Sequence, residues 1–132
     1  MVTDKIGDLL TRLRNAAGAG HRFVEIPGSK LKLGIVKVLY EQGYIEAYKF
    51  TQKGPKTTIK IALKYDPITK RPAITEMQRF SKPGLRKYSN ADNIPFIRNG
   101  LGVLIVTTSR GIMTDKQARE QRVGGELLCY VY

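Results

Sequence analysis

The sequence predicts an α+β protein made of two small, packed α/β domains, residues 1–66 and residues 67–132. Helix-like and strand-like patterns alternate through the first half as α-β-α-β-β, whereas the second half shows mostly strands and one short helix. A polar connection that begins at Asp66-Pro67 and continues to about Pro72 separates them. The composition changes little across this boundary, so we expect the two halves to pack together rather than swing freely.

The first predicted element is an amphipathic helix over residues 3–16, followed by a glycine-containing stop at residues 17–20. Its apolar face comprises Ile6, Leu9, Leu10 and Leu13, which recur at helical spacing. Thr3 is placed to cap the start, and Asp4 suits the positive end of the helix dipole.

The rest of the first half predicts one strand, a second helix and a hairpin. Residues 22–26 suit a short strand, and Ser29 is placed to cap a helix that ends at Gln42-Gly43. The apolar stripe of this helix is Leu31, Ile35, Val38 and Leu39, and we expect Lys30, Lys32 and Lys37 to project elsewhere. Residues 44–50 and 57–65 then predict two strands around a turn at residues 53–56, with Ile59, Ile61 and Leu63 on one face.

The second half predicts three strands and a capped helix. Strands are expected over residues 73–80, 101–107 and 126–132, and the nearly continuous apolar character of the middle one favours a central position. Polar turns are expected at residues 90–93 and 108–111. Thr114 and Gln117 form a capping-box pattern at the start of the helix.

The charge balance is the strongest bulk signal. Lys and Arg number 23 and Asp and Glu number 11, so the formal net charge is +12, with +7 on residues 1–65 and +5 on residues 66–132. A domain this basic attracts polyanions, of which nucleic acid is the first expectation and an anionic membrane the second. The alternative is that the lysines only solvate exposed faces. Hydrophobic residues are 42% of the chain, enough for a real core.

The sequence patterns typical of disulfide-bonded, zinc-binding, catalytic and membrane-spanning proteins are missing. Cys129 and His21 are the only residues of their types, which excludes an intrachain disulfide and a Cys/His zinc site and favours a reducing compartment. The phosphate-loop and hydrolase-elbow patterns are missing, and Cys129 lies inside a strand pattern, as a core residue would. The longest apolar run, residues 103–106, is too short to span a bilayer. We therefore expect no catalytic residue, metal, cofactor, small-molecule substrate or membrane.

Three stretches indicate RNA binding. Residues 79–98 combine basic side chains, among them Arg86 and Lys87, with Tyr88, which can stack on a base or ribose. The alternative is a solvated strand with a core tyrosine.

The second stretch is Thr107, Thr108, Ser109 and Gly111, and the third is Gly124, Gly125 and Glu126. Hydroxyls near a glycine can meet a base edge or a ribose 2′-hydroxyl, and the alternative is an ordinary strand-to-helix loop. Glu126 can accept hydrogen bonds from base amino groups or pair with an arginine, and the adjacent glycines also fit any tight turn.

Four ordered segments carry a family resemblance: TDKIGDLLTRLRNA, IPGSK, SKPGLR and GLGVLIVTTSRGIMTDKQAREQRVGGELLCYVY. Together they resemble the eighth-protein family of the bacterial-type small ribosomal subunit over essentially the whole chain. Lys5, Thr107 and Tyr132 stand where proline, serine and tryptophan are usual in that family.

The resemblance implies a two-domain α/β protein that binds a helix in the central domain of small-subunit ribosomal RNA and promotes assembly. It places Thr107, Thr108, Ser109, Gly111, Gly124, Gly125, Glu126, Arg86, Lys87 and Tyr88 on the main RNA surface. It places accessory contacts at Thr3, Asp4, Arg14, Asn15, Ser29 and Lys30. Neighbouring ribosomal proteins are implied partners, as is the chain's own messenger RNA if it acts as a translational repressor, the alternative function. The expected location is the ribosome of the cytoplasm or of an organelle that has its own translation system.

Overall fold

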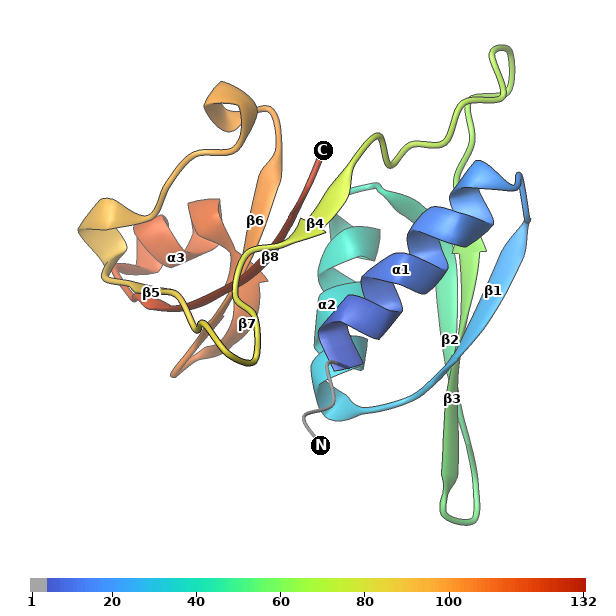
Figure 1. Ribbon diagram of the computed structural model, residues 1–132, viewed down its shortest axis with the longest axis horizontal. Coiled ribbons are helices and arrows are strands. Elements are labelled where there is room, and N and C mark those ends of the chain that lie inside the picture. The colour runs from blue at the N-terminus through green and yellow to red at the C-terminus, as the bar shows by residue number, and fades with distance from the viewer. Residues whose placement is uncertain (1–4) are drawn as a thin grey trace. The chain divides into compact units, whose positions relative to one another are not determined.

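The computed structural model describes residues 5–132, which form two compact units (Figure 1). One unit covers residues 8–75, and the other joins residues 76–132 to the start of the first helix. The elements are α1 (Lys5–Gly18), β1 (Phe23–Pro27), α2 (Lys30–Glu41), β2 (Ile45–Lys53), β3 (Lys56–Leu63), β4 (Met77–Arg79), β5 (Tyr88–Ser89), η1 (Ala91–Asn93), η2 (Arg98–Gly100), β6 (Val103–Thr108), β7 (Gly111–Thr114), α3 (Asp115–Gln121) and β8 (Gly125–Val131). The α+β class and the α-β-α-β-β order of the first half are confirmed. The division at residues 66–67 stays a prediction, since a domain boundary also requires independent folding.

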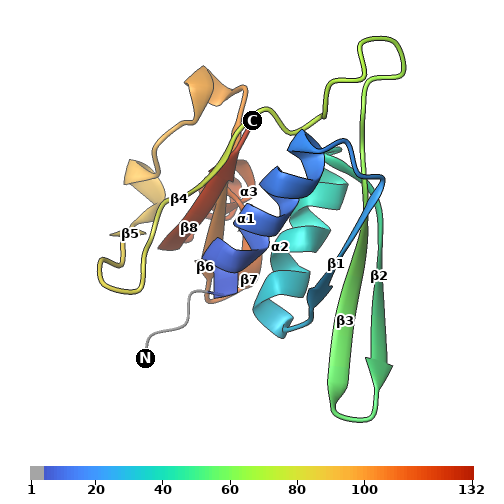
Figure 2. The ribbon, with the colours of Figure 1, turned by 45° about the vertical axis from the view of Figure 1, so that its right-hand side comes forward.

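The first unit is a three-stranded antiparallel sheet in the order β1-β3-β2, with α1 and α2 against one face (Figure 2). Alternation along β3 buries Ile59, Ile61 and Leu63 as the sequence predicts, and exposes Lys60 on the opposite face. The buried stripe of α2 includes Ile35, Val38 and Leu39, so each helix presents its apolar side inward.

The second unit has a sheet in the order β4-β8-β6-β7, and β5 pairs with the other end of β8. The predicted central position of the 101–107 strand is confirmed, because β6 lies between β8 and β7. The α3 helix lies over one face of this sheet and encloses a core of Ile94, Leu104, Val106, Met113, Ala118 and Leu127. The capping box at Thr114 and Gln117 is confirmed: Gln117 N donates to Thr114 Oγ1 (3.1 Å), and Thr114 N donates to Gln117 Oε1 (3.0 Å).

Four sequence-based expectations are corrected, the first in α1. The helix continues through Gly18 instead of ending at residue 16, because Ala16 and Ala17 are buried good helix formers and the left-handed turn comes only at Gly20. The proposed cap Thr3 lies outside the described residues.

The second correction concerns Lys32, which is expected to project away from the apolar stripe of α2 but is buried. Its Nζ donates to the carbonyl oxygen of Pro27, the last residue of β1, at 3.1 Å. The long aliphatic stem lets the charged end reach a backbone acceptor.

The last two corrections concern strands. Within the predicted 73–80 strand only Met77–Arg79 are in the sheet, where they pair with Val131 to Cys129 of β8. The start of the predicted strand bonds elsewhere, since Ala73 N donates to Lys64 O (2.9 Å). The polar turn at residues 108–111 leads into β7 rather than directly into a helix. This strand is too short for its alternation to be read from the sequence.

Candidate nucleic-acid interface

The sheet register of the second unit brings the C-terminal candidate residues together at one end of the sheet. Tyr88 and Thr107 both lie opposite Glu126, and Thr107 also lies opposite Ile112. In the next row, Ser89 and Thr108 lie opposite Gly125, and Thr108 lies opposite Gly111. Three stretches that are far apart in the chain therefore form one surface, called here the sheet-end surface: Arg86, Lys87, Tyr88, Thr107, Thr108, Ser109, Gly111, Gly124, Gly125 and Glu126.

Directly opposed residues in antiparallel strands present their side chains on the same face. Val106 lies opposite Leu127, and both belong to the core beneath α3. Their neighbours Thr107 and Glu126 therefore face the other side of the sheet, together with Tyr88. Because Tyr88 is 70% exposed, its ring is available for stacking.

The β6–β7 turn is stabilised by the side chain of Thr108 and not by that of Ser109. Thr108 Oγ1 donates to Gly111 O (2.9 Å) and accepts from Arg110 N (3.0 Å), and Gly111 has φ 110°, which favours glycine. Ser109 is exposed, and its hydroxyl has no hydrogen-bond partner within residues 5–132. The local turn role that Ser109 could have had is therefore filled by its neighbour.

The paired glycines allow three strands to approach closely. A Cβ on Gly125 would lie 2.0 Å from Thr107 O, and one on Gly124 would lie 2.2 Å from Ser89 O. Both clashes are with backbone, which cannot move aside as a flexible side chain can. Glycine is thus required here by strand spacing, and the tight-turn alternative does not describe its role.

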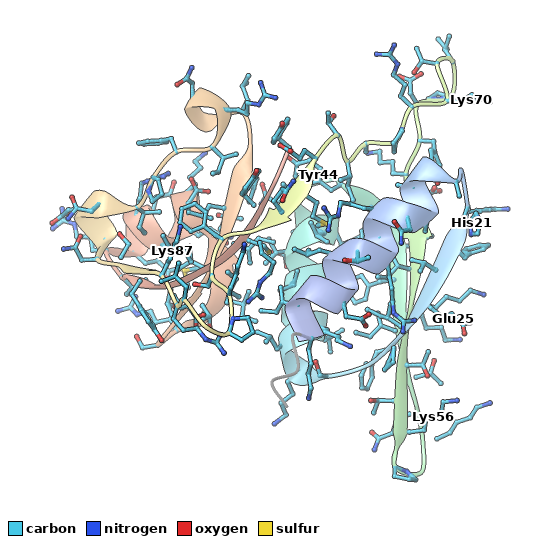
Figure 3. All side chains as sticks on the ribbon, in the orientation of Figure 1. His21, Glu25, Tyr44, Lys56, Lys70 and Lys87 are labelled. Atoms are coloured by element: carbon cyan, nitrogen blue, oxygen red, sulfur yellow. The ribbon has the colours of Figure 1, made fainter. Side chains whose placement is uncertain are left out.

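The basic segment before β5 is fixed by side chains that sequence reasoning did not select. The buried Ser81 hydroxyl accepts from Lys87 N (2.8 Å) and donates to Lys87 O (3.1 Å), and Leu127 N also donates to Lys87 O (2.8 Å). The Lys87 ammonium lies 5.0 Å from the centre of the Phe80 ring, and Figure 3 labels Lys87. The only sequence signal for this interaction was the serine of the Ser81-Lys-Pro-Gly motif.

Glu126 in β8 forms an ion pair with Arg86, which precedes β5: Arg86 Nη1 and Glu126 Oε2 are 2.9 Å apart. The Glu126 side chain is 14% exposed and that of Arg86 is 47% exposed. The carboxylate therefore orients the guanidinium, whose planar fork of five N–H groups matches the oxygens of a phosphate as well as those of a carboxylate. Of the two roles considered for Glu126, the arginine partner is the one found.

The N-terminal candidates do not form one cluster. Ser29 caps α2 by accepting from Lys32 N (3.2 Å), beside the exposed Lys30. Arg14 and Asn15 are exposed near the other end of α1, which runs in the same direction as α2 in Figures 1 and 2. Thr3 and Asp4 lie outside the described residues.

The described residues offer neither a reactive thiol, nor a metal site, nor a membrane-spanning helix. Cys129 is fully buried, and desolvation raises the pKa of its thiol to about 12, so the nucleophilic thiolate is strongly disfavoured. Among residues 5–132 no group of three His, Cys, Asp or Glu side chains could hold a metal ion. In the same part of the chain, no helix has the length and apolar character that crossing a membrane requires.

Comparison with known proteins gives one consistent result. The model of the family described as ribosomal protein S8 matches residues 4–132. Proteins named small ribosomal subunit protein uS8 from Christiangramia forsetii and Flavobacterium johnsoniae are each 59% identical over 132 residues, covering all of both chains. The uS8 protein of Bacteroides thetaiotaomicron is 56% identical over 131 residues, which is 99% of this chain and all of that protein.

Proposed function

The chain belongs to the ribosomal protein S8 family of the small subunit, and from this premise we propose that its sheet-end surface binds a helix in the central domain of small-subunit ribosomal RNA. The observation that carries the proposal is the convergence of Tyr88, Thr107 and Ser109 with Arg86 and Lys87 at one end of one sheet. Binding there promotes the folding of this RNA region during assembly.

Each chemical group on the surface suits a different part of RNA. Arg86 and Lys87 neutralise phosphates, and the exposed Tyr88 ring stacks on a base or ribose. The Ser109 hydroxyl can donate and accept, so it can meet both a base edge and a 2′-hydroxyl, the group that distinguishes RNA from DNA. A strand end fixed by backbone pairing holds these groups in place before RNA arrives, which lowers the entropy cost of binding.

The accessory contacts are assigned to the first unit and to the chain start. Lys30, Arg14 and Asn15 are exposed and suit phosphate or ribose contacts, whereas Ser29 supports Lys30 by capping α2. Thr3 and Asp4 complete the set through the family motif. Neighbouring small-subunit proteins are further partners, and the ribosome of the cytoplasm is the proposed location.

A direct test is hydroxyl-radical footprinting of a small-subunit RNA transcript with the purified chain, together with titration of the protected region as an isolated helix. We expect protection confined to the central domain and tighter binding to that helix than to an unrelated duplex of equal length. Equal affinity for the two duplexes would contradict the proposed site. A role as repressor through the same surface would appear as competition between the ribosomal helix and the chain's own messenger RNA.

A further inference from the structure

The face of the β1-β3-β2 sheet away from the helices is a second basic surface. The register places Lys49 opposite Lys60, Thr51 opposite Thr58 and Lys53 opposite Lys56. All six lie on the face opposite to the buried Ile59 and Ile61. This outer sheet face, defined by these three pairs, contains none of the residues assigned above.

The outer sheet face is concave and carries unneutralised positive charge. Its side chains line a groove of about 390 Å³, in which Glu25 is the single acid among the lining residues of the described chain, 5–132. Glu25 lies opposite Lys60, yet the Lys60 ammonium sits 4.6 Å from the centre of the Phe23 ring instead of pairing with it. None of the four lysines forms an ion pair within residues 5–132.

The β2–β3 hairpin extends this charge beyond the helices of its own unit (Figure 1). Lys53 and Lys56 stand at its end, where Gly54 adopts φ 59°, and Figure 3 shows Glu25 and Lys56 on the side away from the helices. From Lys60 to Lys56 is four residues of extended strand, roughly 13 Å at the usual rise. The lysines therefore form a track rather than a single point of charge.

We propose that the outer sheet face binds the phosphodiester backbone of a second segment of RNA, independently of base sequence. The proposal rests on the function proposed above, since it assigns a further contact to the same RNA-binding protein. Lysine ammonium groups and threonine hydroxyls recognise phosphate oxygens. Among the described residues that line the groove there is no Asn, Gln or Arg, the side chains that read base edges by bidentate contacts. A protein partner fits less well, because the cores of protein interfaces are depleted in lysine.

Two triple variants of equal charge test the proposal. Lys49, Lys53 and Lys56 are changed to Gln in one, and the exposed Lys37, Lys70 and Lys116 are changed to Gln in the other. The probe is a full small-subunit RNA transcript, and the dependence of log affinity on log salt is measured. The face variant should reduce the magnitude of the slope by about 2 to 3, the contribution expected from three neutralised phosphates. The control variant should leave the slope unchanged. A third variant, with Arg at the three face positions, should restore the slope.

Crosslinking provides a second readout. Because Cys129 is buried, the thiol of Thr58→Cys is the accessible one, and a photoreactive maleimide attached there should crosslink to the RNA transcript. The same label on Lys116→Cys should give far less product. Thermal melts of all variants should match the wild type, since the changed side chains are exposed or half-buried.

The outcomes separate the two proposals. Wild-type protein without preference for the central-domain helix would defeat the proposed function, whereas equal salt slopes for the face and control variants would defeat only this inference. A face variant that binds RNA with an unchanged slope but is lost from assembled subunits would assign the face to an acidic protein instead, and would overturn the RNA assignment.

Discussion

Two adjacent hydroxyls in the β6–β7 turn have different roles. Thr108 Oγ1 makes two hydrogen bonds to the turn backbone, whereas the Ser109 hydroxyl makes none among the described residues. A buried or turn-forming hydroxyl supports stability, and a free one at a binding surface supports affinity. This difference lets a single turn be tested for folding and binding separately.

We predict that Ser109→Ala lowers the affinity for the central-domain RNA helix by roughly 1–3 kcal/mol, by analogy with base-edge contacts to DNA, and leaves the melting temperature unchanged. The matched control is Thr108→Val, which keeps the side-chain shape, removes both turn hydrogen bonds and should cost about 0.5–1.5 kcal/mol of stability for each. RNA titrations and thermal melts on both variants provide the measurement. A Ser109→Ala protein that melts early but binds normally would remove Ser109 from the interface.

At the scale of elements, the arrangement of the sheet-end surface depends on the close approach of the β8 and β6 backbones. The Gly125 position leaves no room for a Cβ, because Thr107 O would lie 2.0 Å away. Any side chain there must separate β8 from β6 and disturb the row that holds Tyr88, Glu126 and Thr107.

Gly125→Ala should therefore destabilise the fold by about 1–3 kcal/mol or more, as overpacked sites do, and should also weaken RNA binding at temperatures where the variant is folded. Gly84→Ala is the control, because a Cβ at Gly84 meets nothing within 4 Å and should have little effect. Denaturant unfolding followed by RNA titration measures both effects. Equal stability of the two variants would show that the strands can separate at no cost.

The α3 helix is short, and an ion pair between two of its own residues stabilises its position against the sheet. Asp115 Oδ2 lies 2.8 Å from Arg119 Nη1, and Arg119 Nη2 also donates to the carbonyl oxygens of Ile94 (3.2 Å) and Pro95 (2.9 Å). Asp115 Oδ1 accepts from Leu104 N at 3.3 Å. Asp115 and Arg119 thus join the helix to β6 and to the loop that contains Ile94 and Pro95.

Arg119→Ala should lower the free energy of unfolding by roughly 2–4 kcal/mol, because it leaves the buried Asp115 carboxylate without its cation. Lys116→Ala on the same helix, at an exposed position, should change stability by less than about 0.5 kcal/mol. Urea unfolding of the two variants is the measurement. If they unfold at the same urea concentration, the ion pair does not hold the helix.

At the scale of the whole molecule, the net charge of +12 predicts binding that depends strongly on salt. If about five phosphates of the isolated central-domain helix are neutralised, log affinity should fall with log salt at a slope of about −4 to −5, using the coefficient for duplex DNA. Lys87→Gln should reduce the slope by about one without changing which RNA is preferred, and Lys70→Gln should not change it. A slope near zero would contradict electrostatic binding.

Much of the chain's organisation could be predicted from the sequence because its signals are local. Apolar spacing predicted α1, α2 and the β2–β3 hairpin, and cap residues such as Ser29 and Thr114 marked helix starts. The basic composition and ordered motifs indicated RNA binding and the family. Each of these signals lies within a few residues of the structure it specifies, so no knowledge of distant contacts is needed.

Only the tertiary structure decided how the candidate residues are used, because their partners are distant in the chain. Arg86 meets Glu126 forty positions away, and Gly125 is constrained by the backbone of Thr107 on another strand. The extent of β4 likewise depends on a distant strand, because Met77–Arg79 pair with residues 129–131 of β8. Strand register aligns such groups, and between strands that are distant in the chain it is set by which face each strand buries in the shared core, which local propensity does not encode.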